Sequence, residues 1–520
     1  MRLLARTLAA AAAGAGAGLA FEPYSWVYLL PASIAVLTGL CVGRRLRSGF
    51  WLGSVFGTAF MLVLLPWLQV IAVYAWVPLA LLEGLFYGLA GLVVSAVAGP
   101  AVRLRLWPVW AACAWPLLEA LRSTVPFGGF PWGRLGFAMD DTPVAPALAY
   151  VGAAGVTFLV ALVGTTVAWA VLQLRRTPVR AVVAVVAAIA VACVAALVPW
   201  QATRPTDRRV AVAAVQGNVP GAGLDAFAER RLVLDNHVEA TRRLADRVAD
   251  GTSPRPDFVV WPENSSDIDP YTDPAARSDI GTAAIAMGVP LLMGAVVGDR
   301  ANDGWFNRII VWSAQGTPGA YYDKTHPVPF GEYIPLRAFL APRIPALQQI
   351  PNDMVRGTRS GVLQVGPARV GALTCFEVAY DGLLRDLLDG GAEVIVTPTN
   401  NATYTGTGQV EQQFAMSRAR AVETGRYVVV ASTNGISGIV APDGDVVARA
   451  PERRQAVLES SIALITRQTP ATVLGPWPER ALSAAAVLSL LVGVSVGYRR
   501  GGRSGRPPEH QLRAGTGSRS

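Results

Sequence analysis

Hydrophobic positions divide the chain into three parts. Residues 1–200 are almost continuously apolar, residues 207–468 alternate short apolar runs with polar stretches, and residues 480–498 are apolar again before a polar tail at 499–520. Crossing the hydrocarbon core of a membrane takes about 20 apolar residues. Eight segments approach that length: 3–20, 26–43, 50–70, 73–98, 106–121, 146–172, 181–199 and 480–498. The pattern predicts seven transmembrane helices, a large domain outside the bilayer, an eighth transmembrane helix and a disordered tail.

The segment between the seventh and eighth spans has the pattern of an α/β domain. Short β-branched runs begin at 210, 258, 291, 309, 394 and 427. Helices are expected near 225–249, 272–287, 380–390 and 409–424. Strands that alternate with helices over this length predict a layered α/β domain.

The charged residues predict how the spans are oriented. The chain has 45 basic and 36 acidic residues, for a net charge of +9. Sixteen arginines lie before the first span, in every second connection between spans, or in the tail, and among them lies a single acid, Glu509. Cytoplasmic loops collect Arg and Lys, so we expect both termini in the cytoplasm and the domain at 207–468 on the other side.

The charge pattern also bears on two alternatives, nucleic-acid binding and a cleavable signal peptide. The rest of the chain is net acidic, so the positive charge indicates topology and gives no support to nucleic-acid binding. A cleavable signal peptide is the alternative interpretation of residues 3–20. The basic connections alternate with connections that have no basic excess, and this alternation fits best if that first span is retained.

Cys375 is the one cysteine of the outer domain, since Cys41, Cys113 and Cys193 lie in apolar spans. An unpaired thiol there is either a nucleophile or an inert core residue. The apolar run before Cys375 predicts a strand that ends at the thiol, with a helix from about Tyr380. At such a strand-to-helix turn the thiol is exposed for attack, and the backbone N–H of the next residue can face a developing oxyanion.

Two further residues stand near predicted strand ends. Lys324 is the single lysine among 45 basic residues, which favours a chemical role over a surface charge, because a compact ammonium can stabilise an oxyanion where arginine cannot replace it. Glu263 follows an apolar run and Trp261-Pro262. It is either a general base or an ordinary loop acid or helix cap. A loop with two prolines and a glycine is expected to return Glu332 towards Lys324.

Three motifs in this order resemble the carbon–nitrogen hydrolase, or nitrilase, superfamily. They are Trp-Pro-Glu-Asn at 261–264, Asp-Lys-Thr-His-Pro-Val-Pro-Phe-Gly-Glu-Tyr at 323–333, and Leu-Thr-Cys-Phe-Glu at 373–377. The resemblance implies an α-β-β-α sandwich with a Glu-Lys-Cys triad. The spans and the 326–333 sequence resemble the apolipoprotein N-acyltransferase family within it. One stretch departs from that family's pattern: Thr399–Tyr404 replaces an Asn-Asp-Ala-Trp-Phe-like loop.

The resemblance to the N-acyltransferases implies a two-step acyl transfer in a bacterial plasma membrane. Cys375 would take a fatty acyl group from a phospholipid as a thioester and pass it to the α-amino group of a diacylated apolipoprotein. Glu263 would be the general base, while Lys324 and the Phe376 N–H would stabilise the oxyanion. Glu332 would orient Lys324, and Glu377 would gate or shape the pocket. Further residues are candidates for the lipid entrance: Phe130, Trp132, Tyr333 and Tyr404.

Three alternatives stay open from the sequence. A membrane-tethered amidase or nitrilase would share the triad, although eight spans exceed what a tether needs. A transporter, or a scaffold with an inactive domain, is a further possibility, but within the spans the acids are chiefly Glu83 and Glu119. The aromatic loop at 125–137 is equally explained as an ordinary interfacial anchor. No metal or other cofactor is expected, because the three histidines are far apart in the sequence.

Overall fold

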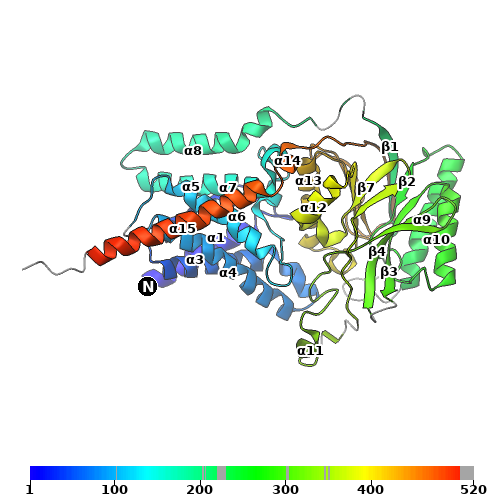
Figure 1. Ribbon diagram of the computed structural model, residues 1–520, viewed down its shortest axis with the longest axis horizontal. Helices are drawn as coiled ribbons and strands as arrows, with labels where there is room; N and C mark the ends of the chain where they lie inside the picture. The colour runs from blue at the N-terminus through cyan, green and yellow to red at the C-terminus, as the bar shows by residue number, and fades with distance from the viewer. Residues whose placement is uncertain are drawn as a thin grey trace, which may run out of the picture.

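The computed structural model describes residues 1–100, 102–201, 204, 207–219, 230–299, 304–344, 347–348 and 352–503. It consists of a bundle of apolar helices, an α/β sandwich, and a last helix that returns along the bundle (Figure 1). The helices of the bundle are α1 (Arg2–Gly18), α2 (Leu29–Cys41), α3 (Leu46–Leu64), α4 (Val73–Val97), α5 (Trp107–Ala112), α6 (Ala114–Arg122), α7 (Leu148–Gln173), α8 (Pro178–Cys193) and α15 (Trp477–Arg503).

Within the described residues, five helices are long and apolar enough to cross a membrane. They include α3, α4, α7, α8 and α15, whereas α1 and α2 have 17 and 13 residues. The expected span at 106–121 is interrupted, because this segment forms two helices, α5 and α6, of 6 and 9 residues, which are joined at Cys113. The break follows Ala112, four residues before Pro116. A proline ring collides with the carbonyl four residues earlier and lacks the N–H of a helical bond.

The last helix also differs from the prediction. The expected span at 480–498 is longer, because α15 starts at Trp477 and continues to Arg503. The predicted disordered tail therefore does not begin at 499. Basic residues such as Arg499 favour the C-terminal end of a helix, where the helix dipole is negative. Residues 504–520, like the part of the predicted 225–249 helix before Arg230, lie outside the described residues.

The α/β part of the chain contains two six-stranded sheets. The strands of the first sheet, in spatial order, are β12 (Ala456–Ala463), β1 (Arg209–Gln216), β2 (Phe258–Val260), β3 (Leu291–Asp299), β4 (Gly304–Trp312) and β5 (Pro318–Asp323). Those of the second sheet are β11 (Val446–Arg449), β10 (Gly438–Val440), β9 (Val428–Ser432), β8 (Val394–Thr399), β7 (Ala368–Ala372) and β6 (Val362–Val365). β1, β2 and β3 are parallel neighbours, as are β7, β8 and β9.

The sheets face each other, and helices cover their outer faces. Side chains of both sheets form one apolar layer between them. Outside the first sheet lie α9 (Arg230–Ala249) and α10 (Pro274–Met287), and outside the second lie α12 (Asp381–Asp389) and α13 (Gly408–Thr424). Two short helices, α11 (Arg337–Leu340) and α14 (Pro470–Leu474), lie in the connections. The predicted layered α/β domain is therefore confirmed as an α-β-β-α sandwich.

The helix bundle and the sandwich share one hydrophobic core. The largest buried cluster runs through the bundle and includes Phe376, Val378 and Ala379 after β7, and Met416 and Val422 of α13. Figure 1 shows the bundle at one end of the molecule, the sandwich at the other, and α12–α14 between them. The turn that carries Cys375 is thus packed directly against the bundle.

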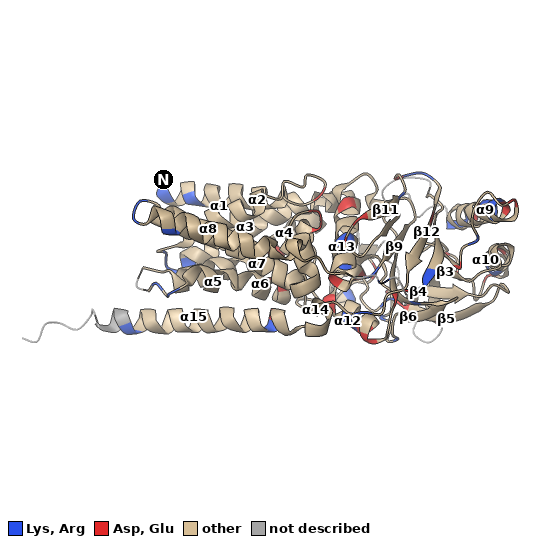
Figure 2. Ribbon diagram, turned by 90° about the horizontal axis from the view of Figure 1, so that it is seen from above, with Lys and Arg blue, Asp and Glu red and all other residues tan. Residues whose placement is uncertain are grey.

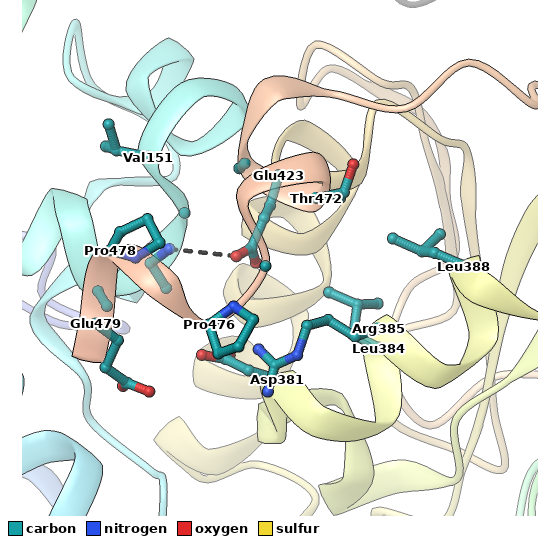
Figure 3. Close-up of a pocket in the computed structure, with 15 residues that line it drawn as sticks. Val151, Asp381, Leu384, Arg385, Leu388, Glu423, Thr472, Pro476, Pro478 and Glu479 are labelled. Carbon is teal, nitrogen blue, oxygen red and sulfur yellow. Dashed lines mark hydrogen bonds between the residues drawn. The ribbon is translucent and has the colours of Figure 1, made fainter. Parts of the chain in front are cut away.

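Buried ion pairs join the same two parts. Arg134, from the loop between α6 and α7, binds Asp381 at 2.6 Å, Glu479 at 3.3 Å and Glu119 at 3.4 Å. Arg420 of α13 binds Asp381 at 2.7 Å. Asp381 and Glu479 line a small cavity at this junction, where α12 faces the start of α15 (Figure 3). Asp381 therefore connects an arginine of the bundle with an arginine of the sandwich, and we call this set the Asp381 ion network.

Candidate active site

Lys324 lies between two carboxylates. Its Nζ is 3.0 Å from Glu263 Oε1 and 3.0 Å from Glu332 Oε1. Asn307 of β4 bridges the same two oxygens, since its Nδ2 donates to Glu263 at 2.6 Å and to Glu332 at 2.9 Å. Lys324 and Glu263 are each only 3 % exposed. The structure thus brings together Glu263, Lys324 and Glu332, which are 69 residues apart at most in the chain.

Glu263 and Lys324 each follow a strand of the first sheet. Glu263 comes just after β2, and its Oε2 accepts a hydrogen bond from the Asn400 N–H at 2.8 Å. Gly294 of β3 packs against this turn so closely that a Cβ there would lie 2.6 Å from the Glu263 Cα. Lys324 is the first residue after β5. The ends of neighbouring strands therefore fix the ammonium and the carboxylate.

Cys375 begins a short 3₁₀-helix, η7 (Cys375–Ala379), after β7. Its φ of 50° lies in the left-handed region, which is unfavourable for a residue with a side chain. Its Sγ is 3.9 Å from Gln413 Oε1 on α13. Cys375 is partly buried as a residue, and Phe376 beside it is buried. The predicted strand-to-helix turn at the thiol is thus present.

Glu377 ties this turn to the loop that follows Lys324. Its side chain and Thr374 form a reciprocal capping box at the start of η7. Its fully buried carboxylate accepts hydrogen bonds from both segments: Thr374 N at 2.9 Å, Thr325 N at 2.8 Å, His326 N at 3.0 Å, Thr325 Oγ1 at 3.1 Å and Tyr322 Oη at 2.9 Å. Glu377 therefore fixes the loop after Lys324 and the turn at Cys375 relative to each other.

The charges at the site favour a neutral thiol beside a cationic lysine. Burial raises the pKa of Cys375, the negative charge of Glu263 raises it further, and Lys324 lowers it in part. Burial alone would lower the pKa of Lys324, but Glu263 and Glu332 raise it well above its usual value. The resting thiol is therefore protonated and needs a proton acceptor before it can attack. Lys324 stays charged and can serve as an electrostatic stabiliser.

Aromatic rings form a wall beside the thiol turn. The Phe376 ring stacks on Trp132 at 5.9 Å and on Phe130 at 5.7 Å. Tyr404 meets Trp67 edge-on at 5.2 Å. Of the four residues predicted at a lipid entrance, Trp132 is buried in this wall, whereas Phe130, Tyr333 and Tyr404 are partly buried. The aromatic loop of the bundle is thus part of the site's surroundings.

Sequence reasoning missed three polar side chains at the site. Asn307 lies inside a strand, Gln413 contacts the thiol, and Gln412 accepts hydrogen bonds from the Nε1 atoms of Trp67 at 3.1 Å and Trp132 at 2.7 Å. The one usable signal was Asn307, a polar residue within an otherwise apolar strand run. Gln412 and Gln413 belong to a polar stretch of α13 that looks solvent-facing in sequence, although both are buried.

Comparison with known proteins agrees with this architecture. Residues 211–470 match the family model described as carbon-nitrogen hydrolase, and residues 13–166 match that of the apolipoprotein N-acyltransferase N-terminal domain. Among relatives, an apolipoprotein N-acyltransferase from Mycolicibacterium smegmatis is 40% identical over 513 residues, covering 94% of this chain and 84% of the relative. One from Chromobacterium violaceum is 29% identical and covers 97% of this chain and 96% of the relative.

Part of this chain also resembles solved structures. An amidase of the nitrilase superfamily from Nesterenkonia has a TM-score of 0.38 at 18% identity and covers 53% of this chain and 96% of its own. A carbon-nitrogen hydrolase from Helicobacter pylori has a TM-score of 0.37 at 16% identity, covering 53% of this chain and 95% of its own.

The sandwich and the match at 211–470 define the class of the catalytic part: it is a carbon–nitrogen hydrolase domain, carried here by a bundle of apolar helices. The bundle has its own counterpart, because the match at 13–166 is to an acyltransferase model. With a 40% identical relative over almost its whole length, the chain belongs to the apolipoprotein N-acyltransferase family.

Proposed function

We propose that this protein transfers a fatty acyl group from a membrane phospholipid to the N-terminus of a bacterial lipoprotein. The acceptor is the α-amino group of an S-diacylglyceryl cysteine, and the acyl group passes through a thioester on Cys375. The observation that carries the proposal is the position of the thiol turn, which is packed into the core of a membrane-type bundle. Family membership supports it, because the relatives are named apolipoprotein N-acyltransferases.

The first half-reaction acylates the thiol. Glu263 takes the proton of Cys375, and the sulfur attacks the ester carbonyl of the phospholipid. Lys324 and the Phe376 N–H stabilise the tetrahedral oxyanion. When the C–O bond breaks, Glu263 returns the proton to the leaving alkoxide, and a lysophospholipid departs. The ion pairs of Lys324 support this assignment, since they keep the ammonium charged and close to the base.

The second half-reaction returns the enzyme to its resting state. The lipoprotein amine attacks the thioester carbonyl, Lys324 again stabilises the oxyanion, and Glu263 removes a proton from the attacking nitrogen. Collapse breaks the C–S bond, and the thiolate takes the proton from Glu263. The products are an N-acylated lipoprotein and the free thiol, so atoms and charge balance over the cycle.

We further propose that the sandwich at 207–468 faces the extracytoplasmic side and that both termini are cytoplasmic. Arginine residues gather at the end of the bundle remote from the sandwich (Figure 2), and a cytoplasmic location is what such clusters favour. The proposed membrane part is then 1–200 together with 480–498. Both lipid substrates would reach the thiol from the outer leaflet.

The test supplies the purified protein in detergent with phosphatidylethanolamine and a synthetic diacylated lipopeptide. We expect a lipopeptide whose mass increases by one acyl group on its amine, together with lysophospholipid. The Cys375→Ala variant should give neither product while it purifies as a folded protein. Release of free fatty acid without N-acylation would instead assign the site to a membrane-tethered hydrolase.

A further inference from the structure

The rim of the site is formed where the bundle meets the lysine loop. The Tyr333 hydroxyl donates to the Phe127 carbonyl at 3.2 Å, and the Tyr380 hydroxyl donates to the Gly129 carbonyl at 3.1 Å. The rings of Phe127 and Phe330 meet edge-on at 6.3 Å. These two phenylalanines are 48% and 41% exposed, respectively. The rim is therefore an exposed aromatic surface at the junction, as expected at a bilayer interface.

The guanidinium of Arg356 lies at this rim. Its Nε donates to the carbonyl of Thr325, the residue after Lys324, at 2.7 Å. One of its terminal nitrogens lies 3.9 Å from where a Cβ would stand on Gly128. The side chain is exposed, and among the described residues no carboxylate forms an ion pair with it. The bond at Nε fixes the plane of the group and leaves its two terminal nitrogens available.

Carboxylates of the neighbouring segments already have partners. Glu332 accepts from Lys324 and from the Val328 N–H, and Glu377 accepts from the loop after Lys324 and from its own turn. Asp353 is paired with Arg337 and accepts from the Ile334 N–H at 2.8 Å. In the part of the chain that the structure describes, the positive charge of Arg356 at the rim therefore has no ion-pair partner, in contrast to the arginines of the Asp381 ion network.

A short chain of contacts leads from this arginine to the thiol turn. Arg356 holds Thr325, and the neighbouring His326 ring lies 4.3 Å from the Tyr380 ring. Tyr380 in turn meets the Phe376 ring edge-on at 5.5 Å. The guanidinium is thus linked to the turn at Cys375 through Thr325, His326, Tyr380 and Phe376.

We propose that Arg356 binds the phosphodiester of the phospholipid acyl donor and so selects the donor over the acceptor. The inference rests on the proposed function. A guanidinium with two free terminal nitrogens matches two phosphate oxygens, and its charge strengthens both hydrogen bonds. The diacylglyceryl cysteine of the acceptor carries no phosphate. Arg356 therefore acts in the first half-reaction and leaves the second unaffected.

The experiment compares two acyl donors on the full-length protein in detergent. One is phosphatidylethanolamine, and the other is the p-nitrophenyl ester of palmitic acid, which has no phosphate. We expect Arg356→Gln to acylate Cys375 from the phospholipid at least about ten-fold more slowly at limiting lipid. It should react with the p-nitrophenyl ester at the wild-type rate, which also shows that the site is folded. Arg356→Lys should keep part of the phospholipid reaction.

Arg359 provides the matched control. It is an exposed arginine three residues along the chain, but its guanidinium lies over the Tyr321 ring at 4.2 Å. Arg359→Gln should behave as wild type with both donors. Equal rates for Arg356→Gln and wild type with phospholipid, or an equal loss with both donors, would overturn the inference.

Two further outcomes separate failure of the lipid assignment from failure of the proposed function. If millimolar inorganic phosphate inhibits the wild type but not Arg356→Gln, while both react with phospholipid at the same rate, the site belongs to free phosphate, and the lipid assignment is wrong. If the wild type reacts with the p-nitrophenyl ester but never with a phospholipid, the proposed function itself fails, whatever the Arg356 variants do. Absence of phosphate inhibition together with a phospholipid-specific defect supports the inference.

Discussion

For single residues, the contacts of Lys324 favour oxyanion stabilisation over proton transfer as the role of this side chain. Two carboxylates hold its ammonium at 3.0 Å, so the lysine remains charged and cannot act as the base. Among the described residues, the second oxygen of Glu263 accepts one hydrogen bond, from the Asn400 N–H. In the proposed mechanism this carboxylate takes the proton of Cys375, and the charge of Lys324 stabilises the oxyanion.

Replacing the base should change thiol reactivity and turnover in opposite directions. Glu263 raises the pKa of Cys375, so Glu263→Gln should lower that pKa and increase the thiolate fraction at any pH below it. Alkylation of Cys375 by iodoacetamide at pH 8 should become faster. Acyl transfer should fall by about 10²–10⁴-fold, because the proton acceptor is gone.

The lysine supplies the control for this experiment. Lys324 lowers the pKa of Cys375, so Lys324→Gln should slow alkylation as well as transfer. If Glu263→Gln slows alkylation and transfer to the same extent, Glu263 serves the structure of the site rather than proton transfer.

The sequence could predict these charged residues but not their polar supports. Lys324 stood out because it is the only lysine, and Cys375 because it is the only cysteine outside the spans. Asn307 and Gln413 carry no such mark. Their importance depends on partners 44 and 38 residues away, and only the folded sheets bring those partners within hydrogen-bond distance.

At the scale of helices and strands, the hydrophobic pattern predicted the buried elements well and the edges poorly. The strands that were not predicted include β5 and β12, the edges of the first sheet, and β6 and β11, the edges of the second. An edge strand is half exposed, so its sequence mixes polar and apolar residues and lacks a long apolar run. The break between α5 and α6 was missed for a different reason, since hydropathy ignores the effect of Pro116 on the backbone.

The Asp381 ion network gives a prediction for the helices that it joins. Asp381 forms ion pairs with both Arg134 and Arg420. Arg420 also donates hydrogen bonds to the carbonyls of Val378 at 2.8 Å and Ala379 at 2.9 Å in the turn that carries Cys375. Asp381→Asn would leave two buried arginines short of an anion. Breaking a buried pair in this way costs about 3–5 kcal/mol of folding free energy.

This loss should appear as a clear fall in the midpoint of thermal unfolding in detergent. Asp386→Asn is the matched control, because Asp386 is an exposed acid on the same helix α12. An unchanged midpoint for Asp381→Asn would mean that the network does not hold the bundle and the sandwich together.

At the scale of the whole molecule, the bundle and the catalytic domain form one continuous body. The core of the bundle includes the residues that follow Cys375, and the aromatic loop at 125–137 reaches the same turn. Eight hydrophobic segments could be recognised in the sequence, but their packing against η7 and α13 could not. That contact depends on residues such as Trp132 and Gln412, which are 280 positions apart. A tethered hydrolase would have no need for this arrangement.

The central claim is that a phospholipid acylates Cys375. Intact-mass spectrometry of the full-length protein after incubation with a phospholipid of defined acyl chain, without any acceptor, tests it most directly. We expect a mass increase equal to one acyl group less one hydrogen atom, located at Cys375, removed by a diacylated lipopeptide, and absent in Cys375→Ser. An unmodified Cys375 in protein that nevertheless N-acylates the lipopeptide would contradict the thioester mechanism.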